Sequence, residues 1–133
     1  MRTIIHAQNI SLTNAIRAHL DRRLAVSLQR FEARISLVEV YIKDINGSDK
    51  GVDDKSVLIK IHVPGMAAVI IENTASDLYT SINIAARRSK RALKRALRRQ
   101  QRIQRQQSMQ LEFDRLPGLA GLRVNALNPI DKP

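Results

Sequence analysis

The residues with the most evident chemistry in this sequence form a block of cations. Positions 87 to 105 hold ten Lys and Arg residues and no Asp or Glu. Their ammonium and guanidinium groups bind phosphate oxygens through charge-assisted hydrogen bonds. A block of this kind is either a solvated, self-repelling tail or an anion-binding surface. The whole chain of 133 residues has a net charge of +11, so a polyanion is the partner that the composition predicts.

The periodicity of residues 78–103 favours the anion-binding surface. At about 100° per residue, the small and aliphatic side chains of this segment fall within an arc of roughly 120°. This indicates a long amphipathic helix with one buried stripe. Like charges at i,i+4 spacing repel each other, which favours a nucleic acid as the neutralising partner. A membrane surface fits less well, because the apolar stripe is rich in Ala and is needed to cover a sheet. The cations on the opposite face are Arg87, Arg88, Lys90, Arg91, Lys94, Arg95, Arg98, Arg99 and Arg102.

Other polar residues offer little for catalysis. His6, His19 and His62 lack the spacing of metal ligands, and the chain has no cysteine, which excludes disulfides, thiolate metal sites and cysteine nucleophiles. The acidic loop Asp44–Asp54 lacks the glycine of a calcium loop at its sixth position and is followed by Lys55 instead of the bidentate Glu. Gly-rich phosphate loops, nucleophile elbows and paired catalytic carboxylates are also absent. We therefore expect no enzyme, no metal site, no cofactor and no small-molecule substrate.

The aromatic content narrows the mode of binding. The chain has no Trp, and Phe31, Tyr41, Tyr79 and Phe113 are its only aromatic residues besides histidine. Proteins that read single strands stack bases on exposed aromatic side chains. An Arg-rich surface with few aromatic residues instead binds phosphates and recognises shape. Structured RNA suits this surface better than a base-specific DNA site, although duplex DNA stays open.

The elements expected to position the cations follow the order β-α-β-β-β-α. Thr13 is an expected N-cap for a helix that runs to about Arg30. The expected N-cap of the basic helix is Ser76 or Asp77. The strands expected near residues 35–45 and 57–63 alternate apolar with polar side chains, so one face of the sheet is covered. This predicts an α+β two-layer sandwich, with a four-stranded sheet and both helices on one face. The first strand is parallel to its neighbour, and the last three form an antiparallel meander.

The chain is expected to form one domain, residues 1–105, with a flexible tail over residues 106–133. The helical pattern fails after about Met109, and Pro and Gly punctuate the rest of the chain. No apolar run approaches the ~20 residues that span a bilayer, and the first residues do not resemble a signal peptide. The expected location is therefore the cytoplasm, without a membrane partner.

Several motifs carry a resemblance to a known family. The opening Met1–Thr13, followed by Ala15–Arg17, is similar to the N-terminus of the ribosome hibernation-promoting factors, also called ribosome-associated inhibitors or sigma-54 modulation proteins. Gly51–Lys55 before a strand and Val63–Gly65 after it occur in the short members. The most specific element is Asp77–Asn83, which resembles the family's Asp-Met/Leu-Tyr-x-Ala/Ser-Ile-Asp at the start of a basic helix. No segment resembles the second domain of the long members, which drives ribosome dimerisation, so any effect on dimerisation stays open.

The resemblance implies a short-form translation inhibitor, active in stationary phase or stress. Such proteins occupy the tRNA and mRNA channel of the small ribosomal subunit at its A and P sites, and they contact 16S ribosomal RNA there. The implied partners are the small subunit and the 70S ribosome, with a monomer off the ribosome. Motif position places Arg88, Arg91, Arg95 and Arg99 among the family's helix-2 cations, and Arg22 and Arg23 in its helix-1 basic region. The expected RNA-binding set is completed by Arg30, which lies off the apolar stripe of the first helix, and by Arg87, Lys94 and Arg98, which come from the helical wheel.

Two alternatives remain beside this interpretation. A general double-stranded-RNA module shares the α-β-β-β-α portion of the expected order and its basic second helix. A transcription-associated regulator is suggested by the older family name, but no feature of the sequence supports it.

Overall fold

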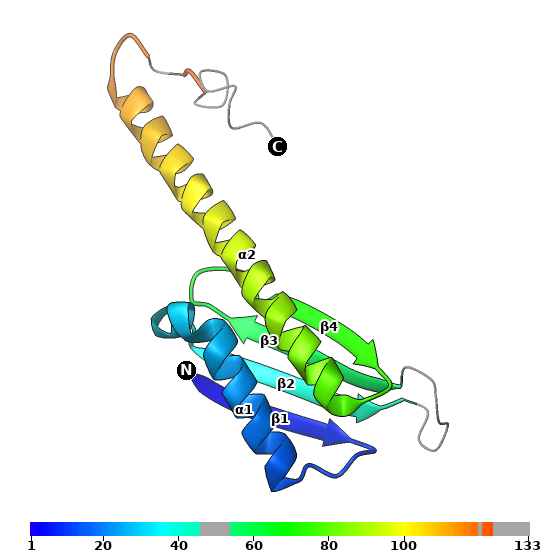
Figure 1. Ribbon diagram of the computed structural model, residues 1–133. Helices are drawn as coiled ribbons and strands as arrows, with labels where there is room; N and C mark the ends of the chain where they lie inside the picture. Colours follow the sequence, from blue (N-terminus) through cyan, green and yellow to red (C-terminus); the bar gives the residue numbers. More distant parts are fainter. Residues whose placement is uncertain (46–53, 120, 124–133) are drawn as a thin grey trace. The chain divides into compact units, whose positions relative to one another are not determined.

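The computed structural model describes residues 1–45, 54–119 and 121–123 (Figure 1). The acidic loop residues 46–53 lie outside the described part of the chain. The chain divides into two compact units, 1–94 and 95–133. One long helix, α2 (Leu78–Arg115), contributes residues to both units.

The first unit contains a four-stranded sheet in the order β1-β2-β3-β4. β1 is parallel to β2, whereas β2, β3 and β4 are antiparallel neighbours. Val40 at the centre of β2 is paired with Ile5 on one side and Ile59 on the other. The predicted topology is therefore confirmed. The strands are β1 (Arg2–Gln8), β2 (Leu37–Asp44), β3 (Lys55–His62) and β4 (Val69–Ala75).

The first helix, α1 (Asn14–Leu28), begins where the sequence predicts. The Thr13 side-chain oxygen accepts a hydrogen bond from the Ile16 N–H at 3.1 Å and so caps the helix. Every fourth residue from Ile16 to Leu28 is buried, which gives α1 its apolar stripe. A short 3-10 helix, η1 (Gln29–Arg34), follows, so α1 ends two residues before the predicted Arg30.

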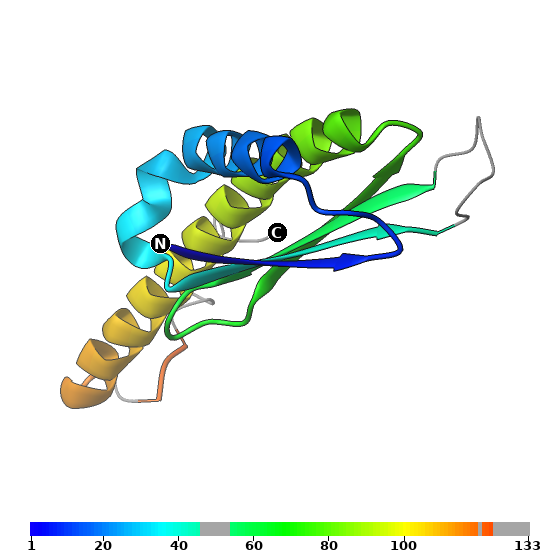
Figure 2. The same ribbon diagram turned by 90° about the horizontal axis from the view of Figure 1, so that it is seen from below.

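The core lies between the sheet and the helices of the first unit. Figure 2 shows α1 and the beginning of α2 on the same side of the sheet. The inward residues of β2 and β3 are at most 1% exposed, and Ile82, Ala85 and Leu93 of α2 are fully buried. The α+β two-layer sandwich with both helices on one face is thus confirmed. The inward strand residues are Val38, Val40, Ile42, Val57, Ile59 and Ile61.

The other face of the sheet carries polar and aromatic side chains. The His6 and Tyr41 rings stack across β1 and β2, with centroids 4.6 Å apart. The Tyr41 hydroxyl donates a hydrogen bond to Glu39 at 2.7 Å, and His62 Nε2 lies 2.6 Å from the other Glu39 oxygen. The hydrogen bonds from Tyr41 and, to a smaller extent, from His62 lower the pKa of Glu39. The hydrogen bond between Tyr41 and Glu39, together with desolvation, raises the pKa of Tyr41.

The helix α2 extends six residues beyond Met109, where the sequence pattern fails. Residues 106–115, assigned by the sequence to the tail, are therefore helical. Gln, Met, Leu and Glu are good helix formers, so helical propensity continues after the amphipathic stripe has ended. Turns follow the helix, because Leu116 N–H donates to Phe113 O and Leu119 N–H donates to Leu116 O. A domain of residues 1–105 with a tail of residues 106–133 remains a prediction.

Candidate nucleic-acid interface

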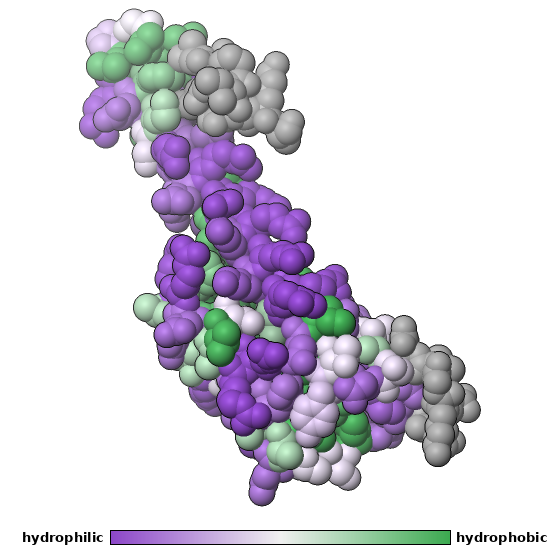
Figure 3. Space-filling view, viewed as in Figure 1, coloured by the Kyte–Doolittle hydropathy of each residue, from purple (hydrophilic) through white to green (hydrophobic). Residues whose placement is uncertain are grey.

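All ten residues of the expected RNA-binding set lie in the described part of the chain, and nine of them are exposed. Only Lys94 is half-buried. The first unit holds three of them on α1 and η1 and four on α2, and the second unit holds the remaining three on α2. Figure 3 shows hydrophilic side chains along the exposed side of α2. The first-unit residues are Arg22, Arg23, Arg30, Arg87, Arg88, Arg91 and Lys94, and the second-unit residues are Arg95, Arg98 and Arg99.

The cations of α2 form no ion pair with the residues that the structure describes. Among the described residues, the ion pairs join Lys55 to Asp44 and to Asp54, and His62 to Glu39. None of these pairs involves α2. Its positive charges are therefore open to an external anion, as the sequence predicts.

Arg88 differs from the other cations of the first unit because it contacts the sheet. Its Nη1 donates to the Glu72 carbonyl at 2.8 Å and to Asn73 Oδ1 at 3.4 Å. The Ser81 hydroxyl donates to the neighbouring Asn73 carbonyl at 2.9 Å. Both carbonyls lie on β4, the last strand of the sheet, and an edge strand presents unpaired backbone groups. Arg88 therefore also caps the sheet edge, a role that the helical wheel does not reveal.

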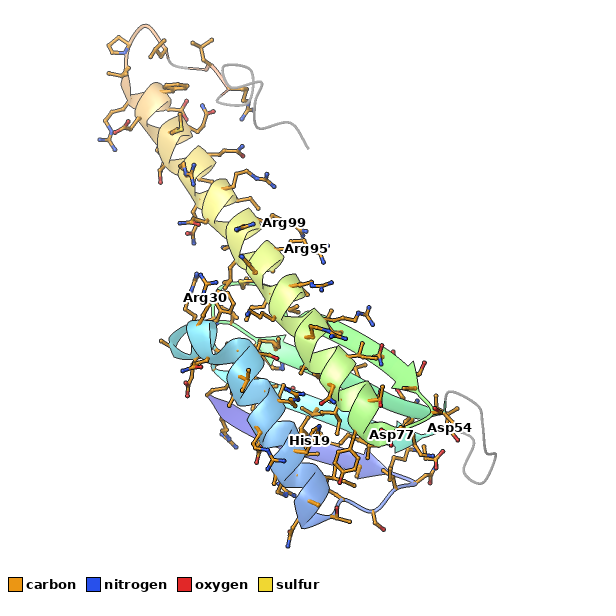
Figure 4. The ribbon with its side chains drawn as sticks, viewed as in Figure 1. His19, Arg30, Asp54, Asp77, Arg95 and Arg99 are labelled. Carbon is orange, nitrogen blue, oxygen red and sulfur yellow. The ribbon has the colours of Figure 1, made fainter. Side chains whose placement is uncertain are left out.

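A polar network joins α1 to α2 within the first unit. Asn83 Oδ1 of α2 accepts a hydrogen bond from Arg23 Nε at 2.9 Å and lies 2.7 Å from His19 Nε2. The His19 ring meets the edge of Tyr79 at a centroid distance of 4.9 Å. Figure 4 shows His19 on α1 and Asp77 at the start of α2. The network orients Arg23, one of the expected RNA-binding residues.

A groove of about 240 Å³ lies beside this network. Sequence reasoning did not single out the lining residue Ser27. It placed Asn83 in the Asp77–Asn83 motif without an orienting role, and it counted Lys90 only as part of the basic face. The spacing Asn83, Arg87, Lys90, at i, i+4 and i+7, is the signal that could have placed these three residues together. The lining residues are Arg23, Val26, Ser27, Asn83, Arg87 and Lys90.

The segment Asp77–Ile82 at the start of α2 caps the helix and packs it into the core. Asp77 Oδ2 accepts hydrogen bonds from the N–H and the hydroxyl of Thr80, both at 3.0 Å. Of the two expected caps, Ser76 and Asp77, the structure therefore selects Asp77. Leu78 and Ile82 are buried in the core. The segment thus fixes where the basic helix begins and which face it turns to the sheet.

Arg30 lies on η1, where its guanidinium is 5.7 Å from the centroid of the Phe31 ring. Contact with an aromatic face restrains an arginine without neutralising it. Arg30 is exposed, so its charge is open to a partner.

The acidic residues at the two ends of the loop are held by a lysine. Lys55 Nζ lies 2.9 Å from Asp44 and 3.3 Å from Asp54. The hydrogen bond to Asp44, opposed by desolvation, raises the pKa of Lys55. Within the described residues, no cluster of three His, Asp or Glu side chains could hold a metal ion. In the same part of the chain, no helix has the length and apolarity needed to cross a membrane.

Comparison with known proteins agrees with the observed fold. Residues 3–101 match the family described as Sigma 54 modulation protein / S30EA ribosomal protein. The chain belongs to this family. The family consists of ribosome-associated factors and is not a known family of enzymes. Membership therefore supports ribosome association and a role in regulating translation. No protein of curated function matches the chain.

Two solved structures share the fold. A ribosomal subunit interface protein from Coxiella burnetii has a TM-score of 0.62 at 18% identity, covering 71% of this chain and 96% of that one. The Protein Y N-terminal domain from Thermus thermophilus has a TM-score of 0.58 at 23% identity, and the match covers 71% of this chain and 98% of that one. At these identities the likeness concerns the fold of the family domain alone.

Proposed function

We propose that this protein binds the small ribosomal subunit through 16S ribosomal RNA and inhibits translation there. The observation that carries the proposal is the exposed row of α2 cations, none of which is paired with a carboxylate within the described residues. Family membership supports the ribosome as the site of binding. The name of the Coxiella relative, a ribosomal subunit interface protein, favours a position between the subunits.

The proposed mechanism is electrostatic binding followed by steric exclusion. Each cation that contacts a phosphate releases condensed counterions, so the affinity falls steeply with salt. The folded body then occupies the tRNA and mRNA channel at the A and P sites, during stationary phase or stress. Catalysis has no part in this mechanism, because the protein acts by occupying space.

Sedimentation of the protein with ribosomes tests the proposal. The wild type should migrate with small subunits and 70S ribosomes at low salt and leave them as the salt concentration rises. Exchanging Arg91 and Arg95 for Glu should abolish co-sedimentation without unfolding the protein, since both side chains are exposed. A matched control exchanges Arg2 and Lys43, exposed residues of the sheet, for Glu. This control changes the net charge equally and should keep binding. A wild type that sediments free at low salt would refute the proposal.

A general module for double-stranded RNA is the second candidate. The arrangement of α1, β2, β3, β4 and α2 supports it, as does an open cationic surface that suits any RNA backbone. A competition experiment separates the two candidates. If ribosome binding is specific, an excess of a plain RNA duplex should displace the protein poorly. Equal competition by duplex and ribosomes would favour the general module.

A further inference from the structure

The end of α2 that lies beyond the family domain carries an interaction surface of its own. The family match ends at residue 101, and the two related structures are matched over nearly their whole length but over 71% of this chain. In the second compact unit, α2 nevertheless continues to Arg115. We propose that residues 102–116 pair antiparallel with the same residues of a second copy of the chain. The contact is independent of the proposed function, because it uses none of the ten residues of the expected RNA-binding set.

Apolar side chains gather at this end of the chain. Among the described residues, five of the eleven exposed large apolar side chains lie in the second unit. Figure 3 shows a hydrophobic group of side chains at the end of α2. Exposed apolar side chains that form one patch mark an interaction site. The five residues are Ile103, Met109, Leu111, Leu116 and Leu122.

An apolar stripe follows one side of this helix end. Met109, Phe113 and Leu116 stand at i, i+4 and i+7, which is the spacing of residues that contact a partner along one helix face. Gln110 Nε2 donates to the Leu122 carbonyl at 2.6 Å, so the chain after the helix lies against its last turns. Phe113 is half-buried, whereas Met109 and Leu116 remain 37% and 49% exposed. The chain's own turns therefore leave part of the stripe open to a partner.

The charges beside the stripe indicate which partner covers it. Arg105 lies four residues before Met109 and Glu112 three residues after it, so both flank Met109 on the same side of the helix. Neither forms an ion pair among the described residues. In an antiparallel pair of copies, Arg105 of each copy meets Glu112 of the other across a two-fold axis near Met109. A parallel pair would instead bring like charges together. An antiparallel second copy therefore complements the apolar stripe and both flanking charges.

The length of the contact limits its strength. Residues 102–115 span about 21 Å at 1.5 Å per residue, which places the interface at the small end of specific protein contacts. The net charge of +11 on each copy also opposes association. We therefore expect a reversible dimer, with a dissociation constant on the order of 10–100 µM.

Sedimentation equilibrium of the free full-length protein tests the contact, at about 0.15 M salt so that long-range repulsion is screened. The wild type should show a monomer–dimer equilibrium, and Met109→Arg should abolish it. The matched control is Leu111→Arg, the same kind of change about 200° away around the helix, which should dimerise as the wild type does. Both side chains are exposed, so the helix content measured by circular dichroism should not change.

A charge exchange tests the antiparallel direction. Arg105→Glu lowers the net charge of each copy and Glu112→Arg raises it, so general repulsion predicts opposite effects of the two substitutions on association. The proposed ion pairs predict that both substitutions weaken association, by at least about tenfold, because each breaks two pairs in the symmetric dimer. A chain that carries both substitutions should recover the wild-type dissociation constant.

A wild type that stays monomeric up to about 1 mM would overturn the inference, as would dimerisation that Met109→Arg leaves unchanged. Two single charge variants with opposite effects would also overturn it. Sedimentation of Met109→Arg with ribosomes separates this inference from the proposed function, because the variant should bind ribosomes as the wild type does. If the wild type were monomeric and Met109→Arg lost ribosome binding, the stripe would belong to the ribosome contact and the inference would be wrong.

Discussion

Arg88 and Arg91 lie on the same exposed side of α2 but should respond differently to the same substitution. Replacing either with Met keeps the length of an apolar stem and removes the charged donor. Arg88→Met also removes the 2.8 Å hydrogen bond to the Glu72 carbonyl at the sheet edge. Arg91 has no such bond within the described residues. The two substitutions therefore separate stabilisation of the sheet edge from RNA binding.

The expected magnitudes follow from these contacts. A hydrogen bond contributes about 0.5–1.5 kcal/mol net, and an edge carbonyl that water reaches belongs at the lower end. Arg88→Met should therefore lower the free energy of unfolding by about 0.5–1 kcal/mol, which corresponds to a Tm shift of about 2–8 °C for a domain of this size. Arg91→Met should leave it unchanged or raise it by about 0.2–0.5 kcal/mol, because Arg91 is four residues from both Arg87 and Arg95 and its loss relieves repulsion.

Thermal and urea unfolding measure stability, and sedimentation with ribosomes across a salt series measures binding. Arg91→Met should weaken binding and flatten the salt dependence by about 0.7 to 0.9, the value of one phosphate contact. Arg88→Met should weaken binding and flatten the salt dependence less than Arg91→Met does, because part of the hydrogen-bonding capacity of Arg88 is used by β4. Equal stability of the two variants would show that the edge contact contributes nothing. Weaker ribosome binding by Arg88→Met than by Arg91→Met would also contradict the proposed division of roles.

Two further predictions concern the start of α2 and the open face of the sheet. Asp77→Ala should lower stability by about 0.5–2 kcal/mol through loss of the N-cap, whereas Ser76→Ala should have no effect in the same thermal unfolding experiment. Tyr41 should ionise above its ordinary pKa of 10.0, and Glu39→Gln should return it toward that value, as followed by tyrosinate absorbance. Because the pKa of Glu39 is lowered in the folded protein, its ionised form stabilises the fold above the ordinary value of 4.5. The stability difference between wild type and Glu39→Gln should therefore vanish as the pH falls below that value. If the stability difference between wild type and Glu39→Gln persisted in acid, it would contradict the lowered pKa of Glu39.

The fold was largely predictable because its signals are local. The alternation of Val57, Ile59 and Ile61 indicates a strand with one covered face, and the structure buries all three completely. Thr13 precedes an apolar stripe at helical spacing and proves to be the cap. The end of α2 was less predictable, because the sequence loses its stripe at Met109 while the residues up to Arg115 still favour a helix.

The candidate site was predictable in composition but not in its contacts. Periodicity alone places the cations of α2 on one surface, and the structure leaves them without carboxylate partners among the described residues. The periodicity of the sequence could not show that Arg88 also binds the edge of β4, since residues 72 and 88 meet only after the helix packs on the sheet.

By itself, the sequence determined the α+β order and the position of the positive charge, because periodicity, capping and charge are properties of neighbouring residues. Only the tertiary structure decided that Asn83 meets Arg23 and His19, which are 60 and 64 positions away. Those contacts depend on how two helices pack over one sheet. Packing therefore turned a basic helix into a groove with two cationic walls.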